Sequence, residues 1–326
     1  MSLHGKRILI TGATGFIGRH LAQRLAQEEG ARVTAVSRRP ERAAPLQEMG
    51  VAYHQGDLAD FDSIDRFVAG QEIIFNLAVA PGTAPEELAR RVNIDAVEHL
   101  VRQSAAAGVQ RVVHFSSMAA YGPPSQQVIT EDLPLDTEQS ARYGRSKALG
   151  EMRALQVAEE IGQDVTVIRP GMVFGPRGRS WTINLFKLVR RGLPVIFGDG
   201  DGHAHPIYID NLVDGLILAA GRPEATGQAF NFVDQALPWR DFLGYYGAMC
   251  GKKPRRLPLA LARVVLTLVK PFIGRTESTE ALLAFYTNKA IYPKTKAEQL
   301  LGYRPQVSIE KGMARTEAWL REAGYL

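Results

Sequence analysis

Short apolar runs alternate with helical segments through the first half of the chain. Each run is rich in β-branched or large apolar residues, and several of the segments between them close with glycine, as helices often do. The runs occupy residues 6–11, 31–37, 51–56, 72–78, 110–116 and 164–170. Because a helix that connects two strands returns the chain to a parallel pairing, this pattern predicts an α/β fold: a doubly wound parallel sheet with helices on both faces.

The alternation breaks down after about residue 170. Glycine and proline become frequent, and shorter predicted helices and strands follow, down to a closing helix near the C-terminus. We therefore predict two interleaved parts: a first domain over residues 1–170 that returns at about 206–232, and a smaller α/β lobe that takes most of 171–326. In open sheets of this kind ligands bind at the carboxyl ends of the strands, so a cleft between the two parts is the expected site.

Composition narrows the class of protein and its surroundings. The chain has 326 residues and a formal net charge of +5, with Lys and Arg interspersed among acids, so a small anionic ligand is favoured over nucleic acid. The single cysteine, Cys250, excludes an internal disulfide, and no signal segment precedes the first predicted strand, so a cytoplasmic location is expected. The apolar stretch 257–274 is too short to span a bilayer. A buried or amphipathic helix is expected there, with contact to a membrane surface as the alternative.

A glycine-rich turn joins the first predicted strand to the first predicted helix. Gly12, Gly15 and Gly18 would supply a tight turn, an approach of the backbone to a pyrophosphate and close packing of helix on sheet; Phe16 and Ile17 open the helix. No Gly-Lys-Ser/Thr follows, which disfavours a nucleotide-hydrolase loop, and a turn without a ligand is the alternative. The position between strand and helix predicts a dinucleotide-binding (Rossmann) domain.

The end of the second predicted strand bears on which dinucleotide binds. An acid there would accept a hydrogen bond from the ribose of NAD, but no Asp or Glu lies between Glu29 and Glu41. Ser37, Arg38 and Arg39 stand there instead, and guanidinium groups suit a 2′-phosphate. The sequence therefore favours NADP(H) over NAD(H), with simply solvated arginines as the alternative.

Eight motifs, in order along the chain, resemble those of the extended short-chain dehydrogenase/reductase family of the NAD(P)-dependent epimerase/dehydratase superfamily. They are TGATGFIG (11–18), GDLAD (56–60), FNLA (75–78), VNIDA (92–96), FSSMAAYG (115–122), YGRSK (143–147), RPGMVFGP (169–176) and YIDNLVDG (208–215). The resemblance covers nearly the whole chain and implies further cofactor-binding residues. These are Asp57 and Leu58 beside the adenine, Ala78 and Val79 along the cofactor channel, Asn93 as a buried support, and Pro170 and Val173.

The same resemblance makes Ser117, Tyr143 and Lys147 the catalytic set. Hydride transfer at a carbonyl carbon needs a proton donor or acceptor at the oxygen, and Tyr143 would be that group. Lys147 follows one helical turn later, where its ammonium would lower the pKa of the tyrosine and would bind the ribose of the cofactor. Ser117 would hold the substrate oxygen. The adjacent Ser116 is the alternative, since neighbouring residues of a strand point in opposite directions and only one of the two serines can face the site.

The substrate itself is indicated less directly. Substrate contacts are expected from Ser117, Tyr121, Arg179, His205 and Tyr208. The stretch HPIYIDNLVDGL (205–216) resembles the 3β-hydroxysteroid dehydrogenase branch, and it lacks the arginine-containing pattern of nucleotide-sugar enzymes. Met118 and Ala119 stand where family dehydratases carry an Asp-Glu pair. We therefore predict the interconversion of a secondary alcohol and a ketone on a bulky, sterol-like substrate.

Two other functions stay open at this point. One is a nucleotide-sugar epimerase that uses the same residues with a tightly held NAD, and the other is a non-catalytic NAD(P)-binding sensor or assembly protein. His203 and His205 are close in sequence, but no further ligands complete a site, so no metal is expected. The family resemblance also implies a homodimer that packs through the helix bearing Tyr143 and the segment 84–107, with a small molecule as the other partner.

Overall fold

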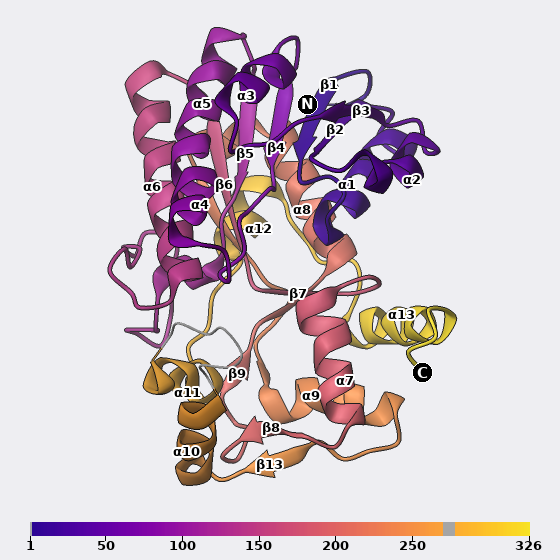
Figure 1. The fold of residues 1–326 in the computed structure, drawn as a ribbon, viewed down its shortest axis with the longest axis vertical. Helices are drawn as coiled ribbons and strands as arrows, with labels where there is room; N and C mark the ends of the chain where they lie inside the picture. Colours follow the sequence, from indigo (N-terminus) through magenta and orange to yellow (C-terminus); the bar gives the residue numbers. More distant parts are fainter. Residues whose placement is uncertain (1, 270–277) are drawn as a thin grey trace.

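A seven-stranded parallel sheet forms the centre of the computed structural model, which describes residues 2–269 and 278–326 (Figure 1). The strand order is β11-β6-β5-β4-β1-β2-β3, so the direction in which strands are added reverses between β1 and β4. The strands are β1 (Arg7–Thr11), β2 (Arg32–Ser37), β3 (Ala52–Gln55), β4 (Ile73–Asn76), β5 (Arg111–Phe115), β6 (Val165–Pro170) and β11 (Ala229–Phe232). The predicted doubly wound parallel sheet is confirmed, and the reversal marks where a ligand is expected.

Side chains along the strands alternate between two cores, one on each face of the sheet. In β1, Ile8 and Ile10 belong to the core under α1 and α8, whereas Leu9 belongs to the core under α3, α5 and α6. The bounds of these helices are α1 (Phe16–Gln27), α8 (Ile209–Gly221), α3 (Phe61–Val68), α5 (Ala96–Ala106) and α6 (Arg142–Ile161). Because both faces are covered, the central strands are mostly apolar, which is why they appear in the sequence as nearly continuous apolar runs.

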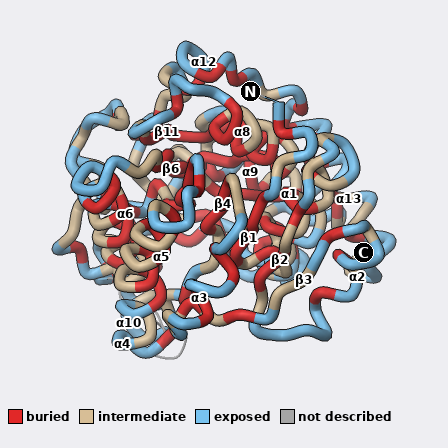
Figure 2. Tube along the Cα trace, turned by 90° about the horizontal axis from the view of Figure 1, so that it is seen from above, coloured by how far each residue is buried: buried red, intermediate tan, exposed pale blue. Residues whose placement is uncertain are grey.

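Short strand pairs and helices build the second lobe. The pairs are β7 (Met172–Phe174) with β10 (Pro206–Tyr208), β8 (Pro194–Phe197) with β13 (Arg255–Leu257), and β9 (His203–Ala204) with β12 (Leu237–Pro238). The helices not yet named are α7 (Leu185–Arg190), α9 (Trp239–Met249), α10 (Leu259–Val269), α11 (Thr279–Thr287), α12 (Thr295–Leu301) and α13 (Ile309–Glu322), together with α2 (Ala44–Gln47) and α4 (Glu86–Arg90), which lie with the sheet rather than in the lobe (Figure 1). Trp239 and Phe242 share one core with Ile8, so apolar packing continues from the sheet into the lobe. Figure 2 shows this buried interior running through the strands, inside an exposed rim.

Helix α10 corrects one expectation. The stretch 257–274 was expected to form a buried or amphipathic helix, but in α10 only Ala262 is buried, and large apolar side chains such as Leu261 and Leu268 are exposed. Residues 270–274 of the predicted stretch lie outside the described residues. The apolar side chains that suggested a buried helix therefore lie on the surface, and α10 itself is at the far end of the lobe (Figure 1). Over the described ranges, the structure contains no helix that is long and apolar enough to cross a membrane.

Candidate active site

The glycine turn between β1 and α1 is shaped by close contacts. Gly12 has a φ of +68°, and a Cβ there would lie 3.0 Å from the backbone of Ala78 in the loop after β4. A Cβ at Gly18 would lie 2.7 Å from the Cα of Ala13, so α1 can approach the turn only without a side chain at this position. Gly15 caps α1, whose first turn contains no acid. Free N–H groups at this helix start therefore face a place suited to an anion.

A cavity of about 490 Å³ opens at this turn, where the strand order reverses. Its lining includes nine residues predicted to bind the cofactor: Gly12, Gly15, Ser37, Arg38, Arg39, Asp57, Leu58, Ala78 and Val79. The predicted residues outside this lining are Phe16, Ile17, Gly18, Asn93, Tyr143, Lys147, Pro170 and Val173. The lining also contains Thr11, Thr14 and Arg42, which the sequence analysis missed. For Arg42 a signal existed, since it continues the basic run after β2.

The end of the cavity near β2 is basic. Arg38, Arg39 and Arg42 line it together, and the Nη1 atom of Arg38 lies 3.9 Å from Oδ2 of Asp57. The hydroxyl of Ser37 accepts a hydrogen bond from the backbone N–H of Arg39 at 3.2 Å. The side chain of Arg38 is 64% exposed, so its guanidinium is available to an anionic ligand. Three guanidinium groups beside one carboxylate favour a phosphate at this end.

A buried polar chain supports the loop between the cavity and the sheet. Thr11 donates to Oδ1 of Asn76 at 2.8 Å and accepts from the N–H of Ala78 at 3.1 Å, while Nδ2 of Asn76 lies 3.3 Å from Nδ1 of His114. Burial, and then the charge of Lys147, lower the pKa of His114 to about 3, so this imidazole is neutral. The chain links β1, β4 and β5 side by side and so fixes their carboxyl ends.

The predicted catalytic residues meet at the start of α6. Tyr143 and Lys147 lie one turn apart on this helix, and the side chains of Tyr143 and Ser117 are hydrogen-bonded. The ammonium of Lys147 is buried and donates to the carbonyl oxygen of Phe115, the last residue of β5, at 2.5 Å. Ser117, two residues later, caps a short 3₁₀ turn by accepting from the N–H of Ala119 at 3.1 Å. Ser116, the alternative to Ser117, is fully buried.

The cavity leads to this set through the loop after β4. Within this loop its lining reaches Pro81, and a Cβ on the next residue, Gly82, would lie 3.2 Å from the Cβ of Tyr143. Asn93 holds the same loop from behind: its side chain accepts from Ala80 N–H at 2.8 Å and donates to Ser146 Oγ at 3.1 Å. Asn93 lies in a π-helical turn, Arg91–Asp95, a form often found at functional sites. The loop and the helix that carries Tyr143 are therefore positioned together.

The expected lowering of the tyrosine pKa is not found. Burial raises the pKa of Tyr143, and the hydrogen bond with Ser117 only partly opposes that rise. Burial also lowers the pKa of Lys147 to about 8, although the charge of Glu151 opposes the change. The reason for the correction is that both groups are withdrawn from water, which disfavours the charged form of each.

Behind Lys147, a buried ion pair joins α6 to β6. Glu151 is fully buried, one turn beyond Lys147, and its carboxylate accepts from Nε of Arg169 at 2.8 Å and also from Nη2. Arg169 in turn donates to the hydroxyl of Tyr121 at 2.6 Å, and that hydroxyl donates to Asn231 at 2.9 Å. Burial alone would lower the pKa of Arg169, but the charge and hydrogen bonds of Glu151 raise it. The hydroxyl of Tyr121, expected in the substrate pocket, is thus engaged in a structural network.

The other predicted substrate residues are dispersed. His205 is buried, and its ring centroid lies 4.8 Å from that of Tyr292. Burial is the main cause that lowers the pKa of His205 to about 4. The ring centroid of Tyr292 also lies 5.8 Å from that of Tyr121, so His205 and Tyr121, both predicted to contact the substrate, belong to one aromatic group. Tyr208 is instead a core residue packed on Phe174, and Arg179 is exposed at the start of a π-helical turn. Within residues 2–269 and 278–326, no three His, Cys, Asp or Glu side chains are grouped to hold a metal.

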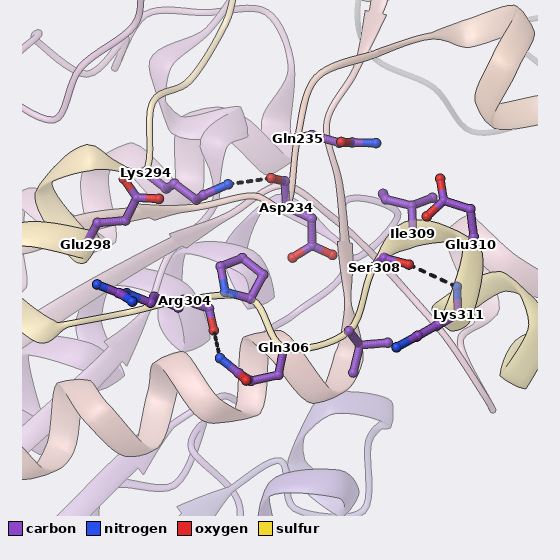
Figure 3. Close-up of a pocket in the computed structure, with 12 residues that line it drawn as sticks. Asp234, Gln235, Lys294, Glu298, Arg304, Gln306, Ser308, Ile309, Glu310 and Lys311 are labelled. Atoms are coloured by element: carbon purple, nitrogen blue, oxygen red, sulfur yellow. Dashed lines mark hydrogen bonds between the residues drawn. The ribbon is translucent and has the colours of Figure 1, made fainter.

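A second cavity, of about 650 Å³, lies where the chain enters α13 (Figure 3). Its charges balance: the lining contains the bases Lys294, Arg304 and Lys311 and the acids Asp234, Glu298 and Glu310. The buried carboxylate of Asp234 is already engaged, by Tyr208 N–H at 2.7 Å and Asn211 Nδ2 at 2.9 Å. Asn211, on α8, also accepts from the backbone N–H groups of Gln306 and Val307, so hydrogen bonds at this cavity connect the C-terminal segment to α8.

Comparison with known proteins agrees with this geometry. The profile of the NAD dependent epimerase/dehydratase family matches residues 8–232, and the chain therefore belongs to that family. It is similar to a 2-alkyl-3-oxoalkanoate reductase of Stenotrophomonas maltophilia, at 28% identity over 96% of this chain and 98% of that protein. It is also similar to 3beta-hydroxysteroid-dehydrogenase/decarboxylase isoform 2 of Arabidopsis thaliana, at 26% identity over 94% of this chain and 61% of that protein.

One solved structure with the same fold is UDP-glucose 4-epimerase of Thermotoga maritima with UDP-glucose. It superposes with a TM-score of 0.78 at 24% identity, covering 97% of this chain and 99% of that one. Membership of the extended short-chain dehydrogenase/reductase group, predicted from eight motifs, is confirmed by the family match. The protein is thus an NAD(P)-dependent enzyme of the dehydrogenase, reductase and epimerase class. A nicotinamide dinucleotide fits the residues present, since the start of α1, with no acid in its first turn, adjoins a cavity that Gly12, Gly15 and three arginines line.

Proposed function

We propose that the protein is an NADP(H)-dependent oxidoreductase that interconverts a bulky apolar secondary alcohol and its ketone. The observation that carries this proposal is a buried apolar cluster that begins at Met118, the residue after Ser117. The cluster contains Met118, Tyr121, Ile129, Val233, Ala290 and Tyr292. A substrate oxygen held at Ser117 would place the rest of the molecule against apolar and aromatic side chains, which suits a sterol-like or long-chain ketone better than a nucleotide sugar.

The residues divide the chemistry between them. When bound, the dinucleotide supplies or accepts the hydride. Tyr143 donates its proton to the substrate oxygen during reduction and takes it back during oxidation, while Ser117 holds that oxygen by a hydrogen bond. Lys147, with a pKa of about 8, stays largely protonated at neutral pH and lies one helical turn from Tyr143, where its ammonium would bind the ribose of the cofactor.

The preference for NADP(H) is tested by replacing Arg38 and Arg39 together with glutamine. Charge-assisted hydrogen bonds to a 2′-phosphate are lost, so the KM for NADPH is expected to rise roughly ten- to hundredfold while that for NADH changes little. Steady-state kinetics with both cofactors measure this ratio. Arg321→Gln, on the exposed face of α13, is the matched control. An unchanged NADPH/NADH ratio in the double variant would show that the arginines are simply solvated.

The reaction is tested by a cofactor-turnover screen over three substrate classes: sterols, 2-alkyl-3-oxoalkanoates and UDP-sugars. We expect net oxidation of NADPH with one of the first two classes. The alternative, an epimerase, is supported by the UDP-glucose 4-epimerase fold match. It predicts isomerisation of UDP-glucose with no net change in added cofactor, by protein that is purified with NAD already bound. That result would replace the proposed function.

A further inference from the structure

Helix α10 displays apolar side chains around most of its circumference. Its eleven residues contain a single buried one, Ala262, whose small cluster with Leu257 and Leu283 is separate from the main core. Leu266 is half-buried against the same cluster, and the other large apolar side chains are open to solvent, with Leu268 66% exposed. The others are Leu259, Leu261, Val264, Val265 and Val269. An apolar patch of this kind marks a surface that contacts another apolar phase.

The chain just before α10 is strongly basic. Lys252, Lys253, Arg255 and Arg256 are exposed, and residues 250–269 contain no acid. Only Pro258 separates β13, which carries Arg255 and Arg256, from the start of the helix, so the Cα atoms of these two arginines lie within about 15 Å of its first residue. The apolar helix and the basic segment are therefore one continuous surface, the α10 surface, defined as residues 252–269.

Among the residues that the structure describes, two acids near this surface are already in ion pairs. Glu280 on α11 pairs with Arg263 at 3.6 Å, and Asp201, in the turn after β8, pairs with Arg240. Asp199 lies in the same turn and accepts a hydrogen bond from the N–H of Asp201 at 2.9 Å. The four bases of residues 252–256 thus give the surface a positive edge beside its apolar part.

An apolar helix next to a basic segment indicates which kind of partner this surface binds. A helix of eleven residues is about 17 Å long and cannot cross a hydrocarbon core of about 30 Å, but it can lie in the interface of a bilayer. A second copy of the chain fits less well, because a symmetric contact near the helix start would bring two basic segments together. A bilayer with anionic lipids satisfies both parts of the surface, apolar side chains in the acyl boundary and bases at the headgroups.

We propose that the α10 surface docks the protein on an anionic lipid bilayer. Figure 1 places α10 and α11 at the end of the second lobe, away from the helices that cover the sheet, so docking leaves the catalytic set clear of the membrane contact. The proposal is independent of which substrate is reduced. It gives the enzyme access to apolar compounds that are dissolved in membranes, which accords with the proposed substrate class.

The test is co-sedimentation of the full chain with vesicles of phosphatidylcholine mixed with phosphatidylglycerol, compared with pure phosphatidylcholine. Binding is expected to the mixed vesicles only and to weaken as salt is added. Lys253→Glu, Arg255→Glu and Arg256→Glu together should lower partitioning at least about a hundredfold. Leu261→Ser, Val264→Ser and Leu268→Ser together should abolish it.

Matched controls separate docking from general surface effects. Val128→Ser, Ile161→Ser and Leu300→Ser remove exposed apolar side chains elsewhere and should leave vesicle binding unchanged. Circular dichroism melting and cofactor turnover in solution check that every variant folds and retains its site. Failure to sediment with mixed vesicles, or equal binding to neutral ones, would overturn the proposal. So would concentration-dependent self-association that only the α10 variants lose, since that would make the surface a contact between copies.

Discussion

Replacing Tyr143 with phenylalanine is expected to lower kcat by roughly a hundred- to ten-thousandfold, the range for loss of a positioned proton donor. The variant keeps the ring but loses the hydroxyl that bonds Ser117 and that would meet the substrate oxygen. Binding of the dinucleotide should change little, because the cavity that would hold it is lined by other residues. Steady-state turnover and a fluorescence titration with NADPH measure the two quantities separately.

The control for this prediction is Tyr245→Phe. Tyr245 also carries a hydrogen-bonded hydroxyl, donated to Glu310 at 3.0 Å, but it lies on α9 in the second lobe. Its variant should keep full activity. If Tyr143→Phe retained the wild-type kcat, proton transfer would have to be assigned to another group.

Replacing Glu151 with alanine is expected to lower the free energy of unfolding by about 3–5 kcal/mol, because it leaves the guanidinium of Arg169 buried without its charge partner. Both side chains are almost fully buried, 0% exposed for Glu151 and 5% for Arg169. The loss should appear as a lower midpoint of urea unfolding with an unchanged slope.

Glu98→Ala provides the matched comparison. Glu98 also pairs with an arginine of α6, Arg153, but the two side chains are 26% and 33% exposed, so the expected loss is about 1 kcal/mol or less. Equal losses in the two variants would contradict the assignment of a buried, stabilising pair.

Glu151→Gln gives a further readout that concerns catalysis. The charge of Glu151 raises the pKa of Lys147, which burial has lowered to about 8. Since the lysine loses its proton as the pH rises through its pKa, removal of the Glu151 charge should move the alkaline limb of the kcat/KM profile to lower pH. A profile that stays in place while stability falls would leave Glu151 with a structural role alone.

Much of the fold and the core of the site could be predicted from local signals. The strand runs and the turn at Gly12 are short-range patterns, because a buried strand needs several apolar residues in succession and a left-handed backbone conformation favours glycine. The catalytic spacing from Tyr143 to Lys147 is likewise one helical turn. In contrast, Glu151 appeared only as one more acid on a helix, and its role depends on Arg169, which reaches it from a different strand.

The sequence by itself determined the alternation of strands and helices in the first half of the chain, the glycine turn at Gly12 and the helix that carries Tyr143 and Lys147, since each is encoded within a few neighbouring residues. Only the tertiary structure decided how deeply those groups are buried. Burial raises the tyrosine pKa where the sequence predicted a fall, and it takes the hydroxyl of Tyr121 into an ion-pair network. The same holds for α10, whose apolar residues predicted a buried or amphipathic helix and are mostly exposed to solvent. The physical reason is that desolvation depends on every element packed around a group, and that packing is set by contacts distant in the chain.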